Sequence, residues 1–165
     1  MSDDNGWERY LETCRTAHGM GMVEVTFALS RDHLPVQTES LWAEQVGPGL
    51  FVLRNSPFDA QGVSFLDTVR AERRGAEWFF VAVHARSGHS TFRVRLEDGS
   101  LRQPWSQAFA SLKRLGCSIE GADERWAAVD VPPAADVHAV VAALQRGEQE
   151  GRWQFEEAHF GHPKA

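Results

Sequence analysis

Residues 87–95 hold the densest group of side chains that could take part in chemistry. A Ser-Gly-His-Ser-Thr run leads into an alternating stretch with two arginines, and the candidates for binding are Ser87, His89, Ser90, Thr91, Arg93 and Arg95. Backbone N–H groups of such a turn, together with hydroxyl and guanidinium donors, can hold a phosphate or carboxylate. The alternative is a hairpin turn whose hydroxyls bond their own backbone while the arginines cover an open sheet face. Anion-binding loops usually contain more glycine, which favours this structural alternative.

The same segment contains the residue types of a hydrolytic triad. Ser87 or Ser90 would be the nucleophile, His89 the base and Asp67 the residue that orients the base. Adjacent residues on a strand point to opposite faces, however, so His89 and Ser90 are poorly placed to bond each other. No Gly-x-Ser-x-Gly motif accompanies them. We therefore predict no catalytic residue.

Two short-range pairs have the side chains of metal ligands. Cys14 and His18 are four residues apart, and His159 and His162 lie near the end of the sequence. Zinc prefers four nitrogen or sulfur ligands, but the first pair lies on a segment expected to fray and the second on a tail, so coincidence is the favoured interpretation. The other cysteine, Cys117, is too distant to suggest a disulfide framework. No metal, no other cofactor and a reducing, cytoplasmic environment are the expectations.

Four more positions are candidates for binding: Trp42, Glu44, Asn55 and Asp67. Alternation places Trp42 and Glu44 on one face of a strand and Glu39 on the other, with the carboxylates expected at a solvated rim. Asn55 begins an Asn-Ser-Pro turn. Asp67 is in phase with apolar neighbours, and a buried carboxylate needs partners. We expect it to bond a loop backbone, with a functional acid as the alternative.

Charge and composition limit the classes of partner. The chain has 165 residues, a formal net charge of −6 and a sequence pI near 5.6. Duplex nucleic acid and anionic membranes both attract positive surfaces, so neither is an expected partner. Six Trp and ten Phe stand beside one Tyr. An exposed Trp would serve as an anchor for a protein partner, and alternation leaves open which face is buried at four positions: Trp42, Trp78, Trp126 and Trp153.

The first half of the sequence has the pattern of a β-rich unit. Residues 1–21 are predicted as an N-terminal extension that could form a short helix. From residue 22 to 89, strands are predicted at 23–29, 40–46, 50–54, 63–71 and 77–85, separated by turn-forming residues. Strands at such short spacing, with no helical pattern between them, indicate a small β-barrel or rolled sheet.

Residues 90–162 follow a different order. Strands are predicted at 91–96, 117–120, 126–131 and 153–159, with one helix from Pro104 to Leu115 and a second opened by Pro132-Pro133. The order β-α-β-β-α-β is typical of a ferredoxin-like sandwich. The predicted fold is therefore α+β, with the N-terminal barrel or rolled sheet packed on a C-terminal ferredoxin-like unit.

Several short motifs recur in the order of a known family. They are Glu-Ser-Leu-Trp-Ala at 39–43, Asn-Ser-Pro-Phe at 55–58, Gly-Val-Ser at 62–64 with Asp67 and Val69, residues 87–91, and the later motifs at 115–117, 131–132 and 151–153. From about residue 23 to 162 the chain resembles the bacterial domain-of-unknown-function family 4265 (DUF4265). The resemblance implies no activity, cofactor or catalytic residue.

Two hypotheses about function follow. The first is a non-catalytic bacterial cytosolic binding protein, for example an immunity or accessory protein that blocks or escorts a protein partner, and the acidic charge and aromatic content support it. The alternative is a small hydrolase or transferase that uses residues 87–95 on an anionic or acyl substrate. The sequence favours the first and leaves the question of enzymatic activity open.

Overall fold

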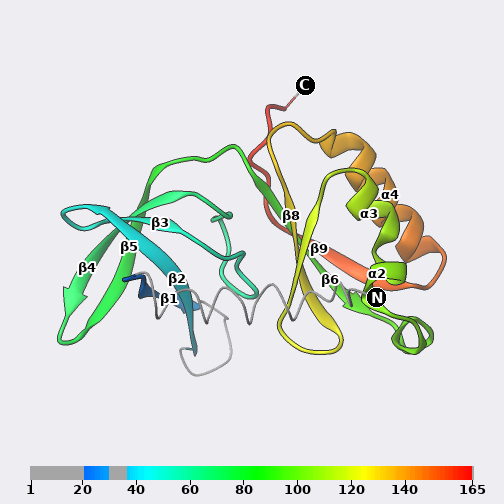
Figure 1. The fold of residues 1–165 in the computed structure, drawn as a ribbon, viewed down its shortest axis with the longest axis horizontal. Helices are drawn as coiled ribbons and strands as arrows, with labels where there is room; N and C mark the ends of the chain where they lie inside the picture. Colours follow the sequence, from blue (N-terminus) through cyan, green and yellow to red (C-terminus); the bar gives the residue numbers. More distant parts are fainter. Residues whose placement is uncertain (1–20, 30–36, 165) are drawn as a thin grey trace.

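The computed structural model describes residues 21–29 and 37–164, which form two sheets with helices beside only the second (Figure 1). Five strands come first along the chain, and the remaining strands and all helices of the described ranges follow. The predicted α+β class is confirmed. The helix considered for the N-terminal extension lies outside the described residues.

The first sheet comprises β1 (Val23–Leu29), β2 (Gln37–Gly47), β3 (Leu50–Leu53), β4 (Thr68–Arg74) and β5 (Glu77–Ala85). Consecutive strands pair antiparallel, and β1 also pairs parallel with β5, which closes the sheet into a barrel. Inward-facing side chains of alternate positions fill it, as the period of two requires. Val25, Leu41 and Phe51 are fully buried, and the rings of Phe27 and Phe80 stack 4.6 Å apart.

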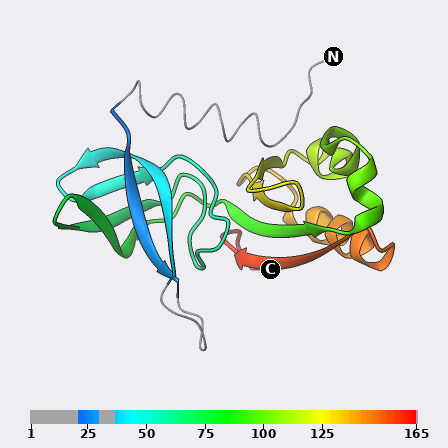
Figure 2. The same ribbon diagram turned by 90° about the horizontal axis from the view of Figure 1, so that it is seen from below.

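The second sheet comprises β6 (Ser90–Leu96), β7 (Ser118–Gly121), β8 (Trp126–Val131) and β9 (Trp153–His159), in the order β7-β8-β6-β9 with every pairing antiparallel. A 3-10 helix, η1 (Asp98–Arg102), is followed by α2 (Trp105–Ala108), α3 (Ala110–Arg114) and α4 (Val137–Gln149). The helices cover one face of this sheet (Figures 1 and 2). Phe92, Val94 and Leu96 point into the core beneath them.

Two predicted helices differ from those observed. The helix expected from Pro104 to Leu115 is divided at Phe109, whose backbone (φ −102°, ψ 12°) leaves the helical region. The second helix does not open at Pro132-Pro133. It begins at Val137, because the Asp136 side chain accepts hydrogen bonds from the N–H groups of His138 and Ala139 and so caps the first turn.

One predicted strand is also wrong in part. Residues 63–67 form a turn, and β4 begins only at Thr68. The turn forms because the Asp67 carboxylate accepts from the N–H of Ser64, while the Asp67 N–H donates to the Ser64 carbonyl. The strands predicted at 126–131 and 153–159 have the predicted bounds.

In the described part of the chain, no helix is long and apolar enough to cross a bilayer.

Candidate functional site

The segment between β3 and β4 connects the barrel to the second sheet. It crosses the middle of the molecule beside β6 and β8 (Figures 1 and 2). Hydrogen bonds join four of its residues to the second sheet: Ser56 to Glu120, Phe58 to Trp126, Gly62 to Ala158 and Ser64 to Thr91. We call the contact between this segment, residues 54–67, and the second sheet the junction. Most of the polar residues singled out in the sequence lie at or beside it.

Asp67 organises one side of the junction. Its side chain is 1% exposed and accepts from the N–H groups of Ser64 (2.9 Å) and Ser87 (2.8 Å) and from Nη1 of Arg86 (3.1 Å). It therefore bonds a loop backbone, as expected for a buried carboxylate. The hypothesis that Asp67 orients His89 is wrong, because the carboxylate beside that imidazole belongs to Asp130, whose Oδ1 lies 2.7 Å from Nδ1 of His89.

The hydroxyls of residues 87–91 also bond within the junction. Ser87 Oγ donates to the carbonyl of Phe65 at 2.7 Å and accepts from the N–H of His89. Thr91 Oγ1 lies 2.7 Å from Ser64 Oγ, and Thr91 is fully buried. These bonds match the structural alternative for the segment, in which hydroxyls satisfy local polar groups.

Ser90 and His162 have the separation of a nucleophile and its base but not the accessibility. Ser90 Oγ lies 2.6 Å from Nδ1 of His162, and Nε2 of His162 lies 3.1 Å from the Pro132 carbonyl. Because a carbonyl only accepts, Nε2 carries the proton and Nδ1 accepts from Ser90. Ser90 Oγ also accepts from the N–H groups of Gly161 and His162, and the residue is fully buried. Its lone pairs are occupied, so the pair fastens the C-terminal segment to β6.

His89 forms a separate pair with Asp130. Its side chain is 11% exposed, and its ring meets Phe65 edge-on. His89 bonds Asp130 and Ser90 bonds His162, so the triad that the sequence argues against is not assembled. Nothing in the sequence pointed to Asp130, and it offered His162 only as a metal ligand with His159. Both lie far from their partners in the chain, 41 and 72 residues away, and no motif links them.

The two arginines of β6 have different environments. Arg95 is exposed, whereas Arg93 is 1% exposed. The Arg93 guanidinium donates from Nε to Glu156 Oε1 (2.7 Å) and from Nη1 to the carbonyl of Ala60 (2.9 Å). The expectation that both arginines cover an open face is therefore wrong for Arg93. Its burial at the junction is possible because charged and carbonyl oxygens satisfy its donors.

The remaining candidates lie on and beside β2. Asn55 is buried, and its Oδ1 accepts from the N–H of Trp42 at 2.8 Å, which holds the turn against the strand. Glu44 is exposed and lies 3.5 Å from Arg54. Trp42 is partly buried. Asn55 lies in the segment between β3 and β4, and its bond to Trp42 joins that segment to the barrel.

Glu39 does not lie at a solvated rim, as the sequence reasoning expected. It shares the inward phase of β2 with Leu41 and is partly buried. Its carboxylate accepts from three successive N–H groups, those of Phe58 (2.6 Å), Asp59 (3.0 Å) and Ala60 (2.7 Å). Burial raises the pKa of Glu39, and this exceeds the opposing effect of the three hydrogen bonds.

The raised pKa of Glu39 predicts a pH dependence of stability. Above the unfolded pKa the folded protein binds more protons at this site than the unfolded chain, so the stabilisation is present in acid and is lost as pH rises through the folded pKa. The difference in free energy of unfolding between the wild type and Glu39→Gln should therefore shrink as pH increases from about 4.5. Urea unfolding at several pH values measures it. A difference that grows with pH would contradict the prediction.

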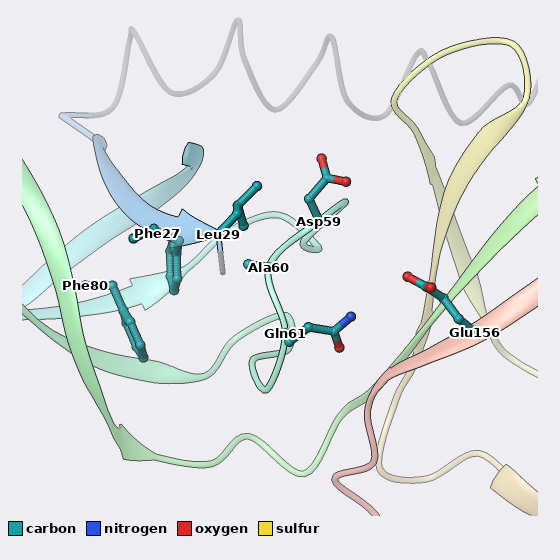
Figure 3. A pocket seen from close by; sticks show the side chains of 8 residues that line it. Phe27, Leu29, Asp59, Ala60, Gln61, Phe80 and Glu156 are labelled. Atoms are coloured by element: carbon teal, nitrogen blue, oxygen red, sulfur yellow. The ribbon is translucent and has the colours of Figure 1, made fainter. Parts of the chain in front are cut away.

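A pocket of about 450 Å³ opens beside this loop. Phe27, Ala28, Leu29 and Phe80 line it from the barrel, Asp59, Ala60 and Gln61 from the loop, and Glu156 from β9. Figure 3 shows the two Phe side chains at one end and Glu156 at the other, with the loop between them.

Comparison with known proteins places these residues in a family. A family model described as a domain of unknown function, DUF4265, matches residues 39–155, which is most of the chain. The chain belongs to the DUF4265 family. A solved structure described as a hypothetical protein from Neisseria gonorrhoeae has a similar fold, with a TM-score of 0.75 and 20% identity, over 86% of this chain and 97% of that chain. No curated protein matches the sequence.

All ten binding candidates lie within the part of the chain that matches the DUF4265 model, as does Asp130. His162, which holds Ser90, lies beyond it. The family description assigns no activity, so the roles of these residues depend on their geometry.

None of the five tryptophans that the structure of this DUF4265 protein describes is exposed. Within residues 21–29 and 37–164, Trp153 is 1% exposed, and the other four Trp are partly buried. Trp78 packs against Phe51 in the barrel, and Trp126 donates to the carbonyl of Phe58. The one exposed large hydrophobic side chain in these ranges is Val46. A recognition surface made of exposed Trp is therefore not present in them.

Cys117 is predicted to resist modification. It is buried, and desolvation together with the nearby Asp130 raises the pKa of its thiol to about 12. Only the thiolate reacts quickly, so native Cys14→Ser protein should react with a disulfide reagent at pH 8 at least 100-fold more slowly than the same protein in urea, as expected from roughly 10³-fold less thiolate. Absorbance of the released thiol measures the rate. Rapid reaction of the native protein would contradict the prediction.

Proposed function

We propose that this DUF4265 protein is a non-catalytic binding protein that acts on a protein partner. The observation that carries the proposal is that the polar side chains of residues 87–93 are bonded or buried within the protein. Their hydroxyls bond neighbouring chain segments, Ser90 is fully buried, and the Arg93 guanidinium is paired. Nucleophilic chemistry requires an accessible nucleophile beside its base. Residues 87–93 offer no accessible nucleophile. This fits the role of an immunity or accessory protein, which blocks or escorts its partner.

We also infer that the C-terminal half is a ferredoxin-like sandwich. Support comes from the chain order β6, α2 and α3, β7, β8, α4, β9 and from the antiparallel strand order β7-β8-β6-β9. In this arrangement the two outer strands are β7 and β9. The face of β6 opposite the helices carries Thr91 and Arg93, and the barrel loop covers it.

One observation favours the enzymatic alternative. The pair of His89 and Asp130 resembles a base held by a carboxylate, and its imidazole is partly accessible. The hydroxyls of Ser87, Ser90 and Thr91 bond other groups, and the Arg93 guanidinium is paired with Glu156. The alternative is therefore second to the binding function, and the same set of variants tests both.

The test uses the tagged full-length protein as bait in lysate of the source organism. Captured proteins are identified, purified and titrated by calorimetry. We expect a defined stoichiometric complex whose affinity changes less than about two-fold in His89→Asn, since a binding role needs no imidazole base. If no protein binds at stoichiometric amounts, and turnover of an ester or phosphate substrate is lost in His89→Asn, the enzymatic alternative replaces the proposal.

A further inference from the structure

A groove of about 390 Å³ lies between α3 and α4. Figure 1 places these two helices at the end of the molecule far from the barrel. Seven residues line the groove: Ser111, Arg114 and Leu115 from α3 and its C-cap, and Ala139, Ala142, Ala143 and Arg146 from α4. Residues 37–164 are described without a gap, so the lining residues and their neighbours in sequence are all defined.

The floor of the groove is apolar and built from small side chains. Ala139, Ala142 and Ala143 are spaced three and four residues apart, so they share one face of α4. Ala143 is 6% exposed and Leu115 packs against the core of the second sheet, whereas Ala142 is exposed. Side chains this small let another backbone approach closely, which suits a helix laid into a groove between two helices.

The polar groups of the groove are cationic. Arg114 and Arg146 line it, one from each helix, and both are exposed. Within the described part of the chain neither has an ion pair or a side-chain hydrogen bond, and none of the seven lining residues is acidic. The nearest acidic residues along α4 are engaged elsewhere, because Glu150 pairs with Arg152 and Glu148 accepts from an N–H of β9. Both guanidinium groups therefore keep their donors for a ligand.

Ser111 adds an unsatisfied group on the α3 side of the groove. Its Oγ is buried and has no hydrogen-bond partner within the described residues. A buried hydroxyl without a partner costs free energy, which an acceptor brought into the groove would recover. The hydroxyl and the two guanidinium groups all donate, so the acceptor they suit best is a carboxylate.

From this geometry we propose that the groove between α3 and α4 receives an acidic amphipathic helix of the partner protein. Its apolar side chains would lie on the alanines and Leu115, and its carboxylates would bind Arg114 and Arg146. Arginine binds carboxylates through two parallel bonds and often dominates the energy of an interface. Because the whole chain carries a net charge of −6, an acidic partner is repelled elsewhere, which favours this orientation. This inference rests on the proposed binding function and adds the chemistry of what is bound.

A direct test needs no partner. n-Hexanoate serves as probe, with n-hexylammonium as the control of opposite charge, in titrations followed by ¹H–¹⁵N NMR of the full chain. Hexanoate should shift the amides of residues 111–116 and 139–146 and bind more tightly than hexylammonium. No shift in these segments, or equal or tighter binding of hexylammonium, would overturn the inference.

The two arginines can be changed without breaking an ion pair of the described residues. Arg114→Gln and Arg146→Gln should each weaken hexanoate binding about five-fold, as expected for the loss of one charge in contact at the surface. The matched control is Arg70→Gln, which removes the same charge from an exposed position on β4. Its affinity for hexanoate should change less than about two-fold. Equal losses in all three variants would overturn the inference.

The captured partner separates this inference from the proposed function. The double variant Arg114→Gln/Arg146→Gln should bind the partner at least ten-fold more weakly, whereas Arg70→Gln should bind it like wild type. If the double variant also binds like wild type, the groove is not the site, although the binding function stands. If no partner is captured, the proposed function fails and the inference fails with it. A dimer of this chain that hexanoate dissociates would identify the occupant as a second copy and overturn the inference.

Discussion

Replacing Gly147 with alanine is expected to lower the free energy of unfolding by about 3 kcal/mol or more, as for overpacking in a core that cannot relax. Gly147 lies inside α4, and a Cβ on it would overlap the indole ring of Trp153. That ring has little freedom to move. It is 1% exposed, it stacks on Phe109, and its Nε1 donates to the carbonyl of Leu144.

The sign of this effect makes the prediction specific. In an open helix, glycine to alanine stabilises by about 1 kcal/mol, because alanine is the better helix former. The control is Gly99→Ala in η1, where an added Cβ meets nothing within 4 Å and no positive φ has to be kept. Its unfolding free energy should change by less than about 0.5 kcal/mol. Urea unfolding followed by Trp fluorescence measures both, and a neutral or stabilising Gly147→Ala would show that Trp153 does not sit on the glycine.

Two strands of this protein were predictable from local signals, although β8 is buried on both faces and β9 on one. Trp126–Val131 and Trp153–His159 were predicted with their observed bounds, since alternation and flanking turns act within a few residues. The helix of 104–115 was not predicted correctly. Its apolar stripe fits a continuous helix, and the break at Phe109 becomes visible only with the three-dimensional packing of that ring, which contacts Trp105 and Trp153.

The candidate site was less predictable because long-range pairs define it. The sequence singled out Ser90, His89 and Asp67, but their partners are His162, Asp130 and Ser87. A bond between residues 72 positions apart has no local signal. Asp67 is buried as expected, but the strand alternation that suggested this is absent at 63–67, and bonds to Ser64, Arg86 and Ser87 hold the carboxylate instead. The burial of the Glu39 carboxylate was not predictable, because the three N–H groups that bind it lie 19 to 21 residues further along the chain.

Removing the Asp67 side chain should have the second large effect. Asp67→Ala is expected to lower the free energy of unfolding by about 4 kcal/mol, because it leaves two backbone N–H groups without an acceptor at a buried site. It also releases Arg86 and separates the turn before β4 from the segment that enters β6. Asp67→Asn should cost about 2 kcal/mol, since its oxygen can still accept while its NH₂ group faces a donor.

Asp136 provides the matched control, because it too accepts from two backbone N–H groups, those of His138 and Ala139, but is exposed at the start of α4. In Asp136→Ala water can replace the lost acceptor, so the expected cost is about 1 kcal/mol, as for other helix caps. Urea unfolding of both alanine variants therefore compares the same lost bonds with and without burial. If Asp67→Ala costs no more than Asp136→Ala, water reaches the junction between the barrel and the second sheet. In that case the polar groups of residues 87–91 are more accessible than their burial indicates, and the argument against a catalytic role for them loses its basis.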